Sequence, residues 1–125
     1  MTAHEANGAY TRLGARIAGN RAFCGYTQRQ LADMCNVHFT YISKIESGNL
    51  PQPPSRALLD VIGQKVHIEP HELYILAGSF DADKLHSQAL ENPRIAALLL
   101  MIENEALSTE TLDTFMGIIE REIEE

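Results

Sequence analysis

The sequence predicts an all-α fold, with five short helices followed by a helical hairpin. Apolar residues recur every three or four positions along most of the 125-residue chain, which is the spacing of one helix face. Glycine, asparagine and proline divide this pattern into segments of about 8 to 14 residues. No segment alternates apolar and polar residues as a half-buried strand would. The composition, 45% hydrophobic and 22% charged, is typical of a globular protein.

The first helix is expected to begin at Tyr10, after a flexible leader over residues 1–9. Leu13 and Ile17 then follow at helical spacing. Gly25 is expected to end the helix, because glycine adopts the left-handed conformation at little steric cost.

Two short helices joined by a tight turn are predicted over residues 28–35 and 39–46. Thr27 is expected to cap the first, since its hydroxyl can accept a hydrogen bond from a first-turn N–H group. Gln30 stands at the position that completes a capping box. Asn36 tolerates the left-handed conformation that ends a helix, so we expect the turn to begin there.

A proline-rich loop over residues 49–54 separates these helices from the last two of the domain. Three prolines within it exclude a helix. Helices are predicted over residues 55–64 and 70–77, and Gly78 is expected to end the second. The predicted five-helix domain therefore spans residues 10–78.

Residues 79–92 are expected to form a polar linker with room for one short helix. Residues 93–125 are predicted to form a hairpin of two amphipathic helices joined by a turn of two or three residues, the first helix ending near Glu105 and the second capped by Ser108. The two apolar stripes offer more surface than two helices can hide from each other, which favours dimerisation through them; the alternative is packing on the first domain. The stripes consist of Ile95, Leu98, Leu99, Ile102, Leu112, Phe115, Met116, Ile119 and Ile123.

Charge is divided unevenly along the chain. The net charge is −7, but residues 1–78 carry +1 and residues 79–125 carry −8. The net charge of the whole chain argues against a nucleic-acid partner. The uneven distribution changes this interpretation, because it leaves the positive field of the protein on its first half. An alternative reading is that the acidic residues only keep a helical tail in solution.

The segment 26–48 (YTQRQLADMCNVHFTYISKIESG) resembles the helix-turn-helix of the lambda-repressor-like, or Xre (Cro/C1-type), family of transcriptional regulators. The resemblance extends over residues 10–78 and implies a five-helix DNA-binding domain. The resemblance is specific because apolar, small and capping residues all occur at the positions where the family has them. They are Thr27, Gln28, Leu31, Ala32, Val37, Ile42, Ile45, Glu46 and Gly48.

Packing requirements account for this pattern independently of the family. Two helices that cross over a turn of three or four residues need a small residue where they touch, and Ala32 fits that position. Val37 is expected to fill the turn. The predicted core of the motif consists of Leu31, Ala32, Val37, Ile42 and Ile45.

The opposite face of the second helix is expected to read DNA in the major groove. Lys44 can donate to guanine, and the Phe39 ring can pack on a thymine methyl group or, alternatively, against the first helix. The predicted base-reading residues are Phe39, Thr40, Ser43 and Lys44.

Contacts to the DNA backbone are expected on both sides of that helix. Gln28 matches the family position that grips a phosphate at a helix N-terminus. Tyr41 reaches a phosphate or base edge, or packs on a neighbouring helix. The predicted backbone contacts are Gln28, Tyr41, Asn49, Gln52 and Arg56. Glu46 is expected to be structural, because a carboxylate facing phosphates would be repelled.

Two residues depart from the family pattern. Asn36 stands where glycine is commonest, which the backbone tolerates. His38 stands where a small hydroxyl usually caps the recognition helix. Histidine is expected to cap poorly, so that water or DNA would stabilise this helix end instead.

The sequence gives little support for a metal site, a redox site or a catalytic site. His67 and His71 are four apart, but a helix start lies between them, which argues against zinc. Cys24 and Cys35 suggest a redox pair, although Cys35 occupies an apolar core position. No phosphate loop, nucleophile elbow or catalytic carboxylate pair is present. We expect no enzyme activity, no cofactor and no metal.

The expected function is a homodimeric repressor that binds double-stranded DNA at a palindromic operator. The alternative is an antitoxin or protease-controlled immunity repressor whose C-terminal helices bind a different protein. A small-molecule sensor would need a pocket, for which the C-terminal part leaves little room. The absence of a signal peptide or a membrane-length apolar run predicts a cytoplasmic protein with no membrane partner.

Overall fold

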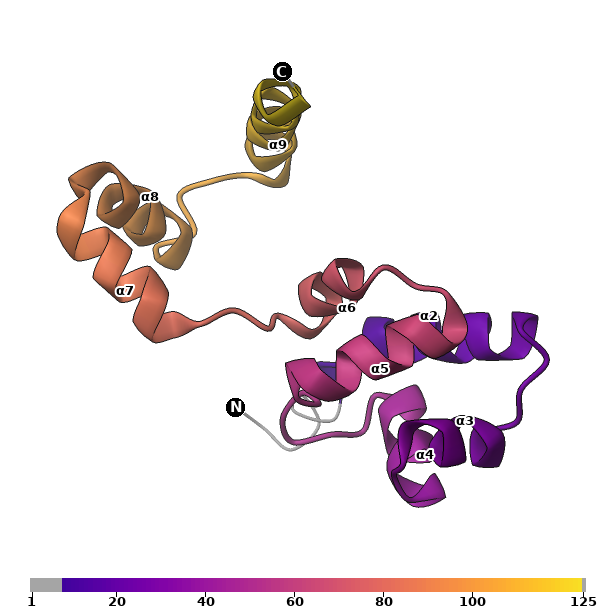
Figure 1. Ribbon diagram of the computed structural model, residues 1–125. Coiled ribbons are helices and arrows are strands. Elements are labelled where there is room, and N and C mark those ends of the chain that lie inside the picture. Colours follow the sequence, from indigo (N-terminus) through magenta and orange to yellow (C-terminus); the bar gives the residue numbers. More distant parts are fainter. Residues whose placement is uncertain (1–7, 125) are drawn as a thin grey trace. The chain divides into compact units, whose positions relative to one another are not determined.

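The computed structural model describes residues 8–124, which contain helices and no strand (Figure 1). The chain divides into two compact units, residues 1–80 and residues 81–125. No helix in the described range is long and apolar enough to cross a membrane. In chain order the helices are α2 (Thr11–Phe23), α3 (Gln28–Cys35), α4 (Phe39–Ser47), α5 (Arg56–Val66), α6 (Pro70–Ala77), α7 (Ala82–Glu91), α8 (Pro93–Glu103) and α9 (Thr109–Glu124).

The first unit packs α2 to α6 around one apolar core. Helix α2 contacts α4, α5 and α6, and α3 contacts both α4 and α5. The core side chains come from every one of these helices and from two loop positions. They are Leu13, Ile17, Leu31, Ala32, Cys35, Ile42, Ile45, Leu50, Leu59, Ile62, Val66, Ile68, Leu73 and Ala77. Of the five residues predicted for the core of the motif, only Val37 is half-buried rather than buried, and it packs against this same core.

The ends of α3 lie where local chemistry predicts them. The Thr27 hydroxyl accepts a hydrogen bond from the Gln30 N–H at 3.1 Å, and the Gln30 side chain accepts one from the Thr27 N–H at 2.8 Å. The capping box is therefore complete. Asn36 adopts the left-handed conformation, with φ 56°, and ends the helix.

A close approach of α2 to α4 fixes the position of α4 in the bundle. A Cβ atom at Gly14 of α2 would lie 2.4 Å from the carbonyl oxygens of both Ile45 and Glu46. Gly14 is itself buried, so only a residue without a side chain lets the two backbones meet here. Sequence reasoning identified Ala32 as the small contact residue of the motif and missed Gly14.

Helices α5 and α6 complete the first unit. The Ser55 hydroxyl caps α5 by accepting a hydrogen bond from the Leu58 N–H at 3.1 Å. Helix α5 runs to Val66, two residues further than predicted, because His67 takes the left-handed end position with φ 61°. Helix α6 has the predicted bounds, and Gly78 ends it with φ 61°.

The second unit consists of α7, α8 and α9. Helix α7 lies within the passage expected to be a linker and packs against α8. Helix α8 ends at Glu103, so residues 104–108 connect it to α9, a longer connection than the predicted turn of two or three residues. Glu105 adopts a left-handed conformation within it. None of residues 81–123 is buried within the unit.

Candidate nucleic-acid interface

Helix α4 has two chemically different faces. Ile42 and Ile45 are fully buried in the core. The remaining side chains of its first two turns are polar or aromatic and reach solvent. His38, Thr40 and Lys44 are exposed, and Phe39, Tyr41 and Ser43 are half-buried. The four predicted base-reading residues thus lie on one short helix, with the core holding its other side.

The start of α4 is capped by His38, contrary to the prediction that histidine caps poorly. The Nδ1 atom of His38 accepts a hydrogen bond from the Thr40 N–H at 3.1 Å. The imidazole thereby satisfies one of the first-turn N–H groups, as a hydroxyl oxygen would. Imidazole can do so because an unprotonated ring nitrogen is an acceptor.

Phe39 contacts a cation that sequence reasoning did not place in the site. The Cζ atom of Arg29, in the first turn of α3, lies 4.3 Å from the centroid of the Phe39 ring. The ring also packs against the core. The prediction offered base contact or burial for Phe39 as alternatives, and the structure leaves the ring half-buried with a guanidinium over it.

A network of charged hydrogen bonds joins α2, α3 and α4. The Glu46 carboxylate accepts two hydrogen bonds from Arg21, at 2.6 and 3.0 Å. It accepts a third from the Gln28 side chain at 2.9 Å. Arg21 also donates to the carbonyl oxygen of Tyr26 at 2.7 Å. Glu46 is therefore structural, as expected.

Gln28 has two roles in this arrangement. Its side-chain amide donates to Glu46, while its backbone lies at the N-terminus of α3. First-turn N–H groups of a helix are unpaired and suit a phosphate. Any phosphate contact of Gln28 thus falls to its backbone N–H and to the second N–H group of its side-chain amide.

The loop after α4 and the start of α5 hold the other predicted backbone contacts. Asn49 and Gln52 are exposed on a loop anchored by the buried Leu50. Arg56 is exposed too, but its guanidinium donates to the carbonyl oxygen of Ser79 at 2.5 Å. Its Cζ atom lies 4.9 Å from the centroid of the Tyr74 ring. One N–H group of Arg56 is thus used within the protein, and its other N–H groups are left to contact a phosphate.

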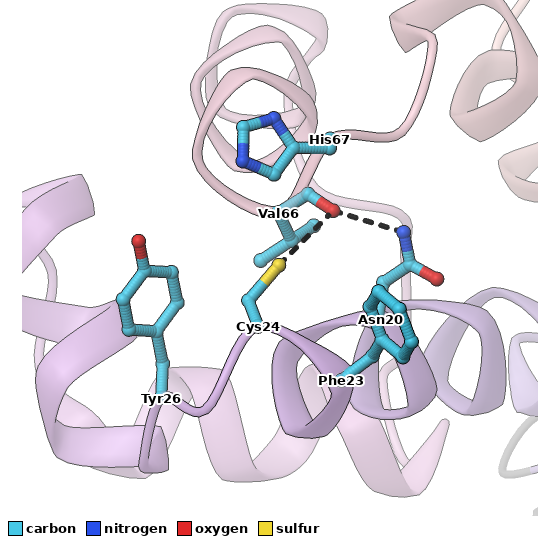
Figure 2. Close-up of a pocket in the computed structure, with 6 residues that line it drawn as sticks. All are labelled: Asn20, Phe23, Cys24, Tyr26, Val66 and His67. Carbon is cyan, nitrogen blue, oxygen red and sulfur yellow. Dashed lines mark hydrogen bonds between the residues drawn. The ribbon is translucent and has the colours of Figure 1, made fainter.

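The two cysteines lie in different surroundings. Cys24 is half-buried beside an open depression lined by side chains of α2 and α5 and the turns that follow them (Figure 2). Its thiol lies 3.7 Å from the carbonyl oxygen of Val66, to which Asn20 donates at 2.9 Å. Cys35 is buried in the core. Burial raises the pKa of the Cys35 thiol, and the charge of Lys65 lowers it by less.

The family comparison identifies the segment that contains this surface. Residues 24–64 match the family HTH_3, a helix-turn-helix family. No curated protein matches the chain. The matched residues include α3, α4 and most of α5.

Two solved structures are similar to the chain. One is the clp gene regulator ClgR from Corynebacterium glutamicum, with 25% identity and a TM-score of 0.48 over 74% of this chain and 89% of that one. The other is a complex of the SinR and SinI proteins, with 21% identity and a TM-score of 0.46 over 90% of this chain and 99% of that one. From the family match and the packing of α3 against α4, residues 24–64 carry the helix-turn-helix of a DNA-binding transcriptional regulator.

Proposed function

We propose that the protein is a homodimeric repressor that reads a palindromic operator through α4. The observation that carries this proposal is the outward face of α4. Its polar and aromatic residues reach solvent, while Gly14, Arg21 and the core fix the helix from behind. A helix held in this way can enter the major groove without first being ordered, and preorganisation favours affinity.

The roles within the site follow from the chemistry of the side chains. Lys44 donates to guanine O6 and N7, and the hydroxyls of Thr40 and Ser43 donate to or accept from base edges. Phe39 contacts a thymine methyl group. Gln28, Tyr41, Asn49, Gln52 and Arg56 position the domain on the DNA backbone, where contacts fix register rather than sequence.

Dimerisation is supported by the second unit. Large apolar side chains of α8 and α9 remain about half exposed within the unit, for example Phe115 at 43% and Ile119 at 47%. A groove between the two helices is lined only by apolar side chains: Leu98, Ile102, Leu112, Phe115, Met116 and Ile119. Helices with so much exposed apolar surface are typical of subunit interfaces. A second copy of the hairpin offers the same surface and would cover it symmetrically.

An antitoxin or protease-controlled repressor is the other class that this surface would suit. In that case α8 and α9 would bind a different protein, and DNA binding would regulate the protein's own gene. The two classes differ in the state of the purified chain, since only the first requires self-association.

Selection of bound duplexes from a random pool tests the proposed function. We expect enriched sequences with two inverted half-sites whose centres lie about 10 base pairs apart, because two recognition helices of a symmetric dimer enter the groove one turn apart. Recovery of pool sequences without enrichment, at both low and moderate salt, would contradict the proposal. The enriched duplex then serves as the operator in the experiments below.

A further inference from the structure

We propose that Arg29 is a specificity-determining residue that reads a guanine beside the base contacted by Phe39. The two side chains would act as one element, with the ring against a thymine methyl group and the guanidinium against the neighbouring guanine. This inference rests on the proposed function and adds to it a base contact from α3, a helix outside the recognition helix.

The position of the guanidinium is the first support. Arg29 is the second residue of α3, and Phe39 is the first residue of α4. The Cζ atom lies 4.3 Å from the ring centroid, within the range of a cation–π contact. The ring is itself held by the core and lies beside the His38 ring, at 6.4 Å between centroids. The guanidinium is therefore placed at the N-terminal end of α4.

The free donors of Arg29 are the second support. A cation over a ring uses the face of the ring and leaves the N–H groups at the edge of the guanidinium available. No acceptor within the described range bonds to them, whereas the guanidiniums of Arg16, Arg21 and Arg56 all donate to protein oxygens. Arg29 is also exposed. It presents an unused, preoriented fork of donors.

Guanine is the acceptor that fits this fork. Its N7 and O6 atoms lie side by side in the major groove, and a bidentate arginine is the commonest specific contact to them. In helix-turn-helix proteins the N-terminal residues of the recognition helix contact base edges. A group fixed 4.3 Å from the first of those residues is placed at the same base step.

The charge of the motif also favours this role. Within residues 28–47 the cations are Arg29 and Lys44, and the anions are Asp33 and Glu46. Glu46 is neutralised by Arg21. With Asp33 counted, α3 and α4 carry a net charge of +1 toward a polyanion, and Arg29 and Lys44 supply its positive part, one at each end of the predicted reading surface.

The test measures affinity for the enriched duplex and for duplexes with each half-site position changed in turn. Arg29→Gln should weaken binding to the enriched duplex roughly 5- to 150-fold per half-site, because each subunit loses one bidentate base contact. It should also abolish discrimination at one guanine position and leave the other positions unchanged. Lys65→Gln removes the same charge from the last turn of α5 and should change affinity less than twofold.

Two further variants separate reading from charge. Arg29→Lys keeps the charge but loses the planar fork, so it should weaken discrimination at the same guanine, by less than Arg29→Gln does. Phe39→Leu keeps the Arg29 side chain but removes the aromatic ring that positions its guanidinium. It should weaken discrimination at that guanine as well as at the neighbouring base. Circular dichroism and thermal unfolding of each variant check that the fold is retained.

Three outcomes would overturn the inference. A uniform loss over all duplexes, with a shallower salt dependence by about one charge, would identify a phosphate contact instead. Unchanged affinity in Arg29→Gln would show that Arg29 does not contact DNA. If the wild-type protein enriches no duplex, both the proposed function and this inference are wrong. If the wild-type protein does select a duplex, but Arg29→Gln gives a uniform loss or no change in affinity, only the inference about Arg29 is wrong.

Discussion

Gly14 shows how one residue sets the position of the recognition helix. A methyl group there would lie 2.4 Å from two carbonyl oxygens of α4, and backbone atoms cannot move aside as a side-chain tip can. Gly14→Ala should lower the free energy of unfolding by about 1–3 kcal/mol, the usual cost of overpacking. Urea denaturation monitored by circular dichroism measures this change.

Gly19 provides a matched control in the same helix. A Cβ atom at Gly19 has no neighbour within 4 Å, so Gly19→Ala meets no steric obstacle. This variant should gain up to about 1 kcal/mol from the higher helix propensity of alanine. Equal stabilities for the two variants would contradict the account of the α2–α4 contact.

The two cysteines should react at different rates. The pKa of Cys35 is raised by burial, so a smaller fraction is thiolate at neutral pH, and the side chain is also enclosed by the core. Because the thiolate is the nucleophile, a maleimide should label Cys24 faster than Cys35, and Cys35 labelling should accelerate as the pH rises. Mass spectrometry of the Cys24→Ser and Cys35→Ala variants measures each rate. Faster labelling of Cys35 would show that the core opens readily around it.

At the residue scale, the sequence predicts local contacts and misses those between distant segments. The Thr27–Gln30 capping box and the left-handed Asn36 were predictable because their partners lie within a few positions. Gly14 was missed because its partners lie about thirty positions away, in another helix. Arg29 was missed for the same reason, since Phe39 meets it only after the chain has turned. The cap formed by His38 was predicted wrongly because an imidazole nitrogen can replace a hydroxyl.

At the element scale, the Arg21–Glu46 pair ties α2 to α4, and Gln28 adds the start of α3. The two side chains are only 18% and 5% exposed, so solvent screens their interaction weakly. Arg21→Met keeps much of the side-chain volume but leaves Glu46 without its charge partner. It should lower the free energy of unfolding by about 3 kcal/mol, as expected for breaking a buried pair, and weaken operator binding because α4 loses a support.

The Arg16–Glu72 pair is the control at this scale. It has a similar distance, 2.6 Å, but its side chains are 40% and 44% exposed. Arg16→Met should therefore cost less than about 1 kcal/mol. If Arg16→Met lowered the free energy of unfolding as much as Arg21→Met, burial would not explain the contribution of the Arg21–Glu46 pair to stability.

Helix positions in the first unit were largely predictable, because apolar periodicity and capping residues agree there. Helix α3 and helix α6 have the predicted bounds. The end of α5 was missed because His67 takes a left-handed conformation that glycine or asparagine more often adopts. The length of the connection between α8 and α9 was underestimated at Glu105. This residue also adopts a positive φ, but glutamate is not a residue type that predicts a turn.

At the scale of the whole molecule, the second unit lacks a buried core in residues 81–123, and self-association would supply one. Phe115→Asp places a charge in the apolar groove between α8 and α9. We expect sedimentation equilibrium to show a dimer for the wild-type chain and a monomer for this variant. The variant should also lose affinity for the operator, because one subunit makes too few contacts.

Phe23 supplies the control for that experiment. It is 90% exposed on α2, outside the second unit, so Phe23→Asp introduces the same charge without touching the groove. This variant should remain dimeric. A wild-type chain that is monomeric at micromolar concentration would contradict the homodimer and favour a different protein partner for α8 and α9.

The most direct test of the central claim, that α4 reads DNA, is a titration of the enriched duplex with Thr40→Ala/Lys44→Ala at several salt concentrations. Thr109→Ala/Lys84→Ala removes the same groups from the second unit and serves as control. We predict that the α4 variant loses about 1–3 kcal/mol per base contact and binds the enriched duplex no better than random DNA, while the control binds like the wild type. If the α4 variant still selects the enriched duplex with wild-type affinity, α4 is not the reading helix.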